Sequence, residues 1–316
     1  MKSTLRLLAV AGALVLTATS GAFAEWKPSG PITMLIGFSA GGGADTQARM
    51  IAEELEKRHG WQIIPEQATG GGGAKLSAKI KDMPNDGTVI GLAVTETYGY
   101  NMIANPKAGY TQADITPLTT TAGFQMGIVA QTSKGWNDFG DVIAAAKAGE
   151  TIRFGTMSPR IADIAYLLGE ANGVEFNIIE VKGGKAVMNG VNAGDMDIGF
   201  MAGIQAKGVA AGDLVNLASA LSTPLKMSPD AKGMDAYGVD FTLDGYFVFV
   251  GPGGMPSDAQ KAIRTAIADI VNDPSTKAGG FIKKAFGGPA TISGSELGGL
   301  LASDAADAER LMMAVN

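Results

Sequence analysis

The chain has 316 residues, a net charge of −6 and no cysteine, and 46% of its residues are hydrophobic. This composition excludes a disordered chain, disulfide bonds, thiol catalysis and thiolate metal sites, and the negative charge disfavours a nucleic-acid partner. The length exceeds the roughly 100–200 residues of one ordinary domain, so two domains are predicted.

Residues 1–24 match an export signal. Lys2 and Arg6 give a basic start, residues 7–19 form a short apolar run, and Ala22-Phe23-Ala24 fits a cleavage site. A membrane anchor is the alternative, but this run is shorter than the roughly 20 apolar residues that span a bilayer. We therefore predict a periplasmic protein that begins near Glu25.

Strand-like apolar runs then alternate with helical patterns along the chain. The predicted strands cover residues 32–38, 62–65, 88–94, 126–130, 151–154, 176–181, 198–201 and 246–250. Helices are predicted at 44–59, 138–148, 185–193, 257–272 and 293–313, with two more following the glycines at 70–73 and the loop at 155–159. Repeated strand, glycine loop and helix are typical of open parallel sheets, whose ligands bind beyond the carboxyl ends of the strands.

Several motifs in this order resemble the substrate-binding proteins of tripartite tricarboxylate transporters, the TctC or Bug family. They are residues 36–45 (Ile-Gly-Phe-Ser-Ala-Gly-Gly-Gly-Ala-Asp), 70–74, Asn85-Asp86-Gly87-Thr88, Tyr110 with 114–118, Lys147-Ala148-Gly149, Lys182-Gly183-Gly184 and Gly194-Asp195-Met196-Asp197. The chain departs from the family at Ala40, at 66–68 and at 157–163, and these departures bear on the ligand more than on the fold.

The resemblance implies an α/β, two-lobed Venus-flytrap fold, type II-like, with mostly parallel sheets and flanking helices. Residues 25–123 plus 245–316 would form the first lobe and residues 124–244 the second. It also implies that the protein captures a small organic acid, such as a di- or tricarboxylate, and delivers it to the membrane subunits of the transporter. A monomer without metal or cofactor is expected.

Two glycine loops, at 39–45 and 69–74, are the leading candidates for a carboxylate site. Glycine lets backbone N–H groups converge on an anion, and a following helix adds the positive end of its dipole. The same glycines would also serve tight strand-to-helix turns. The predicted ligand-binding residues are Ser39, Gly41, Gly42, Gly43, Asp45, Gly71, Gly72, Gly73, Thr95, Thr97, Thr156, Ser158, Arg160, Lys182, Gly183 and Asp197.

Some of these residues have an equally ordinary interpretation. Asp45 would cap a helix, order its loop or accept an ammonium or hydroxyl group of the ligand, and Arg160 would either bind a carboxylate through two hydrogen bonds or lie in solvent. Asp197 would shape the cleft by family position or occupy a turn at the edge of the core. Glu96, beside Thr95 and Thr97, would repel an anion and so faces either solvent or an amino or hydroxyl group of the ligand.

One enzymatic alternative deserves comparison, because Gly37-Phe38-Ser39-Ala40-Gly41 matches the G-x-S-x-G motif of serine hydrolases. Such an enzyme needs a histidine base, and the only histidine, His59, would lie roughly 20 Å from Ser39 at the far end of one helix. No nucleotide-binding motif follows either glycine loop. We therefore predict a binding protein and not an enzyme; a purely structural protein, without a cleft, is the remaining alternative.

Overall fold

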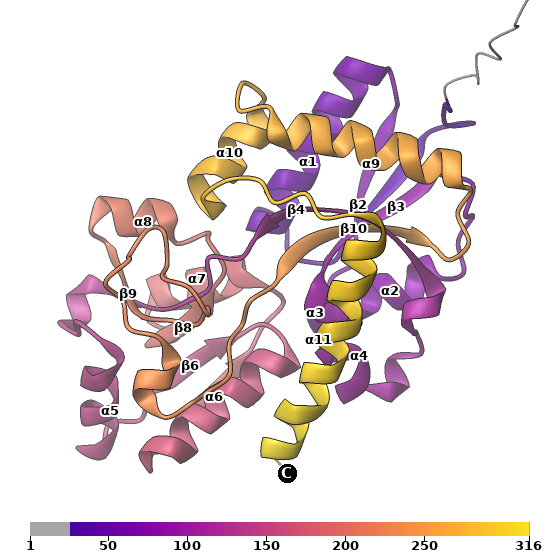
Figure 1. The fold of residues 1–316 in the computed structure, drawn as a ribbon. Helices are drawn as coiled ribbons and strands as arrows, with labels where there is room; N and C mark the ends of the chain where they lie inside the picture. Colours follow the sequence, from indigo (N-terminus) through magenta and orange to yellow (C-terminus); the bar gives the residue numbers. More distant parts are fainter. Residues whose placement is uncertain (1–25, 316) are drawn as a thin grey trace, which may run out of the picture.

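The computed structural model describes residues 26–315, so the predicted export signal lies outside the described residues. The chain forms two five-stranded sheets with helices packed around each (Figure 1). The predicted α/β, two-domain class is confirmed. No helix within residues 26–315 is long and apolar enough to span a bilayer.

The first sheet has the strand order β2-β1-β3-β10-β4. Its strands are β1 (Ile32–Ile36), β2 (Ile63–Gln67), β3 (Val89–Val94), β4 (Ile115–Gly123) and β10 (Tyr246–Pro252). Strand β1 runs parallel to β2 and β3, whereas β10 is antiparallel to β3 and β4. Because β1 and β3 are parallel neighbours, the loops that follow them emerge at the same edge of the sheet.

The second sheet repeats this arrangement in the order β7-β6-β8-β5-β9. Its strands are β5 (Gly127–Gln131), β6 (Arg153–Thr156), β7 (Asn177–Glu180), β8 (Ile198–Met201) and β9 (Leu214–Ser219). Strand β6 is parallel to β7 and β8, and β5 is antiparallel to β8 and β9. Both sheets are therefore mixed: four strands run in one direction, and a single strand, β10 or β5, runs in the opposite direction.

Helices cover both faces of the first sheet. On one side lie α1 (Gly43–His59), α9 (Ser257–Asn272) and α10 (Lys277–Phe286), and on the other lie α2 (Ala74–Ile80), α3 (Thr95–Tyr98), α4 (Tyr100–Ala104) and α11 (Gly294–Val315) (Figure 1). The second sheet packs against α6 (Pro159–Asn172), α7 (Gly184–Ala193) and α8 (Ala206–Ala211), and α5 (Phe139–Lys147) completes that domain.

The pleat of the first sheet explains this two-sided burial. Met34 and Ile36 belong to the core beneath α1 and α9, while Leu35 between them belongs to the core beneath α2 and α11. Alternate side chains of a strand point to opposite faces, so a strand that is apolar throughout needs helices on both sides. This is why the near-continuous apolar runs in the sequence identify central strands.

The chain crosses between the two sheets twice within the described residues, once from β4 to β5 and once from β9 to β10. The crossings lie side by side, because the Phe124 N–H donates a hydrogen bond to the Gly245 carbonyl at 2.8 Å. Only residues 124–126 separate β4 from β5 at the first crossing, whereas residues 220–245 form the longer second crossing.

At the amino-terminal ends of β6 and β8, an ion-pair cluster ties the second sheet together. The carboxylate of Asp197 is buried and accepts hydrogen bonds from Arg153 Nε, from Arg153 Nη2 (both 2.9 Å) and from Lys134 Nζ (2.5 Å). Burial opposes ionisation, but these donors outweigh it and hold the pKa of Asp197 below its usual range.

We expect Asp197→Asn to lower the free energy of unfolding by about 2 kcal/mol at pH 7, since it leaves two cations without their buried partner, although both are partly solvated. A depressed carboxyl pKa stabilises the fold above the unfolded-state value near 4 and is lost as the pH falls through the folded-state value. The difference between the two proteins in urea unfolding should therefore shrink below about pH 4. The exposed neighbour Asp195, changed to Asn, is the matched control and should shift stability by less than about 0.5 kcal/mol; equal losses in both variants would contradict this role for Asp197.

Candidate functional site

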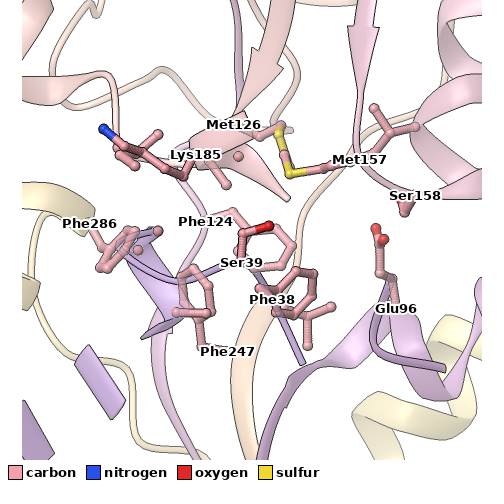
Figure 2. A pocket seen from close by; sticks show the side chains of 18 residues that line it. Phe38, Ser39, Glu96, Phe124, Met126, Met157, Ser158, Lys185, Phe247 and Phe286 are labelled. Carbon is pink, nitrogen blue, oxygen red and sulfur yellow. The ribbon is translucent and has the colours of Figure 1, made fainter. Parts of the chain in front are cut away.

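A pocket lies between the two domains, at the edge where β1, β3 and β6 end. We call it the interdomain pocket (Figure 2). About 50 Å³ of it is open to the centre of a water-sized sphere, which is room for a few waters or one small molecule. Its lining residues are Phe38, Ser39, Gly42, Gly43, Ala44, Val94, Glu96, Phe124, Met126, Met157, Ser158, Ile161, Gly184, Lys185, Ala202, Ile204, Phe247 and Phe286.

The first glycine loop brings the start of α1 to this pocket. Gly41 adopts φ 72°, and its N–H donates to Asp45 Oδ2 at 2.8 Å, while the Gly42 N–H donates to the Ser39 carbonyl at 3.2 Å. These two amides, both predicted to bind ligand, are therefore engaged within the loop. The first helical hydrogen bond runs from Thr46 N–H to the Gly42 carbonyl (2.9 Å), so the earlier amides of Gly43 and Ala44, which line the pocket, lack helical partners.

Asp45 itself does not line the pocket. It is 3% exposed, and its carboxylate also accepts hydrogen bonds from Arg49 Nε at 2.9 Å and from Gln67 Nε2. All of these donors belong to the first domain. Of the three roles that the sequence leaves open for Asp45, which are capping the helix, ordering the loop and contacting the ligand, its hydrogen bonds favour the ordering of the loop.

The second glycine loop, Gly71–Gly73, does not line the pocket, but it packs against residues close to it. Its residues have φ values of 56°, 57° and 96°, which only glycine adopts readily. The Gly72 carbonyl accepts hydrogen bonds from Thr97 Oγ1 (2.7 Å) and Asn101 Nδ2 (3.2 Å). A Cβ atom on Gly72 would come within 2.9 Å of Ser158 Cβ, so the loop packs directly against the second domain.

Of the three residues after β3, only Glu96 lines the pocket. Thr95 is fully buried and its hydroxyl accepts the Tyr246 N–H at 3.2 Å, and Thr97 is held by the Gly72 carbonyl. The Glu96 side chain is directed into the pocket toward Ser158 (Figure 2), and the residue is only 4% exposed. A carboxylate thus faces the space where the sequence predicts an organic acid.

On the other side, Ser158 is the single predicted residue of β6 and α6 that lines the pocket. It is 1% exposed, and its hydroxyl has no hydrogen-bond partner among the described residues. Thr156 is fully buried beneath it, with its hydroxyl also unpartnered. Arg160 is directed elsewhere, because its Nη2 donates to the Thr242 carbonyl at 2.9 Å.

The loop after β7 closes against the loop after β1. The Lys182 carbonyl accepts a hydrogen bond from the Ser39 N–H at 3.2 Å and another from the Ser39 hydroxyl. The Lys182 side chain is exposed, whereas Gly183 packs against Phe38 and Ser39. Asp197 lies at the opposite ends of the strands, in its ion-pair cluster, and has no place in the pocket.

The sequence interpretation did not single out the apolar walls of the pocket. They are formed by Phe38, Val94, Phe124, Met126, Met157, Ile161, Ile204, Phe247 and Phe286. The available signal was position, since Phe38 and Met157 stand in the two loops that directly follow β1 and β6, where ligands of such sheets bind.

The hydrolase motif does not assemble a catalytic site. The Ser39 hydroxyl donates to a backbone carbonyl, and His59 ends α1, seventeen residues long and so roughly 25 Å from end to end. The His59 ring packs on the Trp61 ring, with centroids 4.8 Å apart. Ser39 thus has no histidine base within reach. In residues 26–315 no group of three or more histidine, aspartate or glutamate side chains could hold a metal ion.

Behind Thr95, the last helix, α11, brings a further acid to the boundary between the domains. Burial raises the pKa of Asp304 to about 6, against the opposing effects of Arg160 and of a hydrogen bond with Thr95. Its Oδ2 atom has no hydrogen-bond partner in the described part of the chain. At neutral pH this carboxyl group is therefore ionised at a cost to stability.

We expect Asp304→Asn to raise the free energy of unfolding by about 2 kcal/mol at pH 7.5. A carboxyl pKa that is raised in the fold favours folding below the unfolded-state value near 4, and this contribution is lost as the pH rises through about 6. The gain should therefore disappear near pH 4 when urea unfolding is measured at both pH values. Asp307→Asn, on the exposed side of the same helix, should show no such pH-dependent gain; a gain of the same size would contradict the burial argument.

Comparison with known proteins identifies the family of this architecture. The family model of the tripartite tricarboxylate transporter family receptor matches residues 47–285. The chain is 24% identical over 257 residues to the UPF0065 protein in the TAR-I ttuE-ttuC' intergenic region of Agrobacterium vitis, an alignment that covers 78% of this chain and 73% of that protein.

Two solved structures share the fold. MatC from Rhodopseudomonas palustris with bound malate has a TM-score of 0.79 and 17% identity, covering 92% of this chain and all of the other. The periplasmic binding protein BugD has a TM-score of 0.78 and 20% identity, covering 92% and 98%. The family consists of solute-binding proteins and not of enzymes, which confirms the non-enzymatic interpretation. Because the family match spans well over half of its 316 residues, the chain belongs to the TctC family of tripartite tricarboxylate transporter receptors.

Proposed function

We propose that this protein is a periplasmic receptor that captures a small organic carboxylate between its two domains and delivers it to the membrane subunits of a tripartite tricarboxylate transporter. The observation that carries this proposal is the interdomain pocket at the start of α1. The first domain would comprise residues 25–123 and 245–316, and the second residues 124–244, which agrees with the membership of the two sheets.

The ligand carboxylate would bind at the first turn of α1. Gly43 and Ala44 line the pocket there, their amides have no partner within the helix, and an anion is favoured at the amino-terminal end of a helix. The apolar walls would bury the hydrocarbon part of the ligand, as in most small-molecule sites. Of the residues proposed from sequence, Ser39, Gly42, Gly43 and Ser158 remain as contacts, while Gly41, Asp45 and Gly71–Gly73 would shape the site.

Capture would proceed by domain closure around the bound acid. Contacts between the domains, such as those of Ser39 with the Lys182 carbonyl and of Tyr100 with Asp163, belong to the closed arrangement. A ligand that bridges both domains stabilises that arrangement and shifts the population toward it. The closed form would then be the one that the transporter recognises.

A thermal-shift screen of small organic acids tests the function directly, because a ligand that binds only the folded protein raises its melting temperature. The acid found in this way gives the sharper test with Gly42→Asp. That change places a negative charge at the start of α1, where a Cβ atom would lie 3.1 Å from the Ser39 carbonyl oxygen. We expect affinity to fall at least tenfold by titration calorimetry, from about 1.4 kcal/mol or more of lost attraction.

Gly42→Asn is the matched control, since it adds a side chain of the same size without the charge, and it should lose less affinity than Gly42→Asp. The φ of Gly42, −77°, is open to any residue, so neither variant strains the backbone. Wild-type affinity in Gly42→Asp would contradict a carboxylate site at α1.

A further inference from the structure

The interdomain pocket carries a feature that a site for a simple acid does not need. Glu96 opens α3 directly after β3, is 4% exposed, and points its carboxylate into the pocket (Figure 2). A buried carboxylate is unfavourable unless a cation or several hydrogen-bond donors compensate it. The partners of Glu96 therefore decide what the pocket prefers to bind.

The described residues supply Glu96 with little compensation. Its Oε1 accepts one hydrogen bond, from Asn101 Nδ2 at 3.2 Å, and no lysine or arginine in residues 26–315 forms an ion pair with it. Lys185 lines the same pocket, but its amino group is directed away from Glu96 on the opposite side (Figure 2). The neighbouring Ser158 hydroxyl, buried and unpartnered, can accept a further donor.

The other end of the pocket has the opposite polarity. A Cβ atom on Gly43, at the start of α1, would lie 3.0 Å from Phe286 Cζ, and Phe286 lies across the pocket from Glu96 in Figure 2. The amides of the first helical turn favour negative charge at this end. Between the two ends, Phe38, Phe124 and Phe247 and the two methionines present only apolar surface.

We propose that the ligand is a small aminocarboxylate in which a short apolar segment separates a protonated amine from the carboxylate; this inference rests on the proposed carboxylate-binding function. The amine donates to Glu96 and to the Ser158 hydroxyl, and the carboxylate binds at the start of α1. The ring of Phe38, beside Glu96, adds a favourable surface for a cation. A ligand of a few carbon atoms fits the room available in this pocket.

Glu96 also excludes the matching dicarboxylates. A ligand with a second carboxylate in place of the amine would bring two negative charges together in a poorly hydrated space, where their repulsion is strong. The same side chain thus attracts one class of acid and rejects another, which is the usual way that specificity is built.

The test compares three matched series of three to five carbons by titration calorimetry. They are the terminal aminocarboxylates from β-alanine to 5-aminopentanoate, the monocarboxylates from propanoate to pentanoate, and the dicarboxylates from malonate to glutarate. We expect the wild-type protein to bind its preferred aminocarboxylate at least tenfold more tightly than the dicarboxylate of the same length. This comparison uses the unmodified protein and does not depend on how any variant folds.

Glu96→Gln then isolates the charge while keeping an acceptor for Asn101. We expect it to weaken aminocarboxylate binding at least tenfold, to leave monocarboxylate binding within about threefold, and to improve dicarboxylate binding. Glu66→Gln removes the same charge from an exposed position on β2, outside the pocket, and should change none of these affinities. Melting temperatures without ligand check that both variants are folded.

Dicarboxylates that bind the wild-type protein as tightly as the aminocarboxylates would overturn this inference and leave the proposed carboxylate function intact. An equal loss of aminocarboxylate and monocarboxylate binding in Glu96→Gln would do the same. If primary amines without a carboxylate bind as tightly as the aminocarboxylates, and Gly42→Asp has no effect on them, it is the proposed carboxylate function that fails.

Discussion

The site depends on how Asp45 fixes the loop between β1 and α1. One oxygen of its buried carboxylate accepts a hydrogen bond from the Gly41 amide, and the other accepts hydrogen bonds from Arg49 and Gln67. The loop, helix α1 and the neighbouring strand β2 are therefore all bound to one carboxylate. With the Gly41 and Gly42 amides engaged inside the loop, the next amides, those of the pocket-lining residues Gly43 and Ala44, are the ones left without a partner in the helix. The loop therefore presents the end of a helix and not a nest of successive glycine amides.

The second domain supplies the side of the pocket that lies opposite the start of α1. The parallel strands of both sheets end at the interdomain pocket, so two strand-to-helix loops from each domain meet there, and the contact between Ser39 and the Lys182 carbonyl joins the innermost pair. The acceptor in that contact is the backbone carbonyl of Lys182, so no side chain of Lys182 takes part in it. The contact therefore constrains the position of the loops and leaves the side chains that line the pocket free to vary. Ligand preference is then set by side chains such as Glu96, while the capture geometry is set by the backbone.

Sequence patterns predicted the framework better than the site. The apolar runs at β1, β3 and β8 were found because burial on both faces leaves an unbroken apolar pattern. The helix at 257–272 was found because its buried residues recur at helical spacing along one face. Strand β4 was missed because its centre is three buried threonines, Thr119 to Thr121, and the hydroxyls of the last two are satisfied by Ala290 and Gln47, far away in the sequence. Helix α10 was missed because Gly279 and Gly280 weaken its helical pattern, although Gly279 packs against the Asp273 carbonyl where no side chain would fit.

The same reasoning explains which site residues the sequence could identify. A glycine-rich loop after a strand signals close approach of the backbone, and it led to Gly43 and Ser158 on opposite sides of the pocket. It could not distinguish the loop at 71–73, which has the same composition but turns its carbonyls toward Thr97 and Asn101 and serves as packing. Nor could it decide the direction of Glu96 or Arg160, because direction is fixed by tertiary partners. Arg160 is held by a carbonyl of the second crossing segment, and Glu96 is left facing the ligand space with one amide for support. Charge in a binding pocket is thus decided by which ionisable groups the fold leaves without an internal partner.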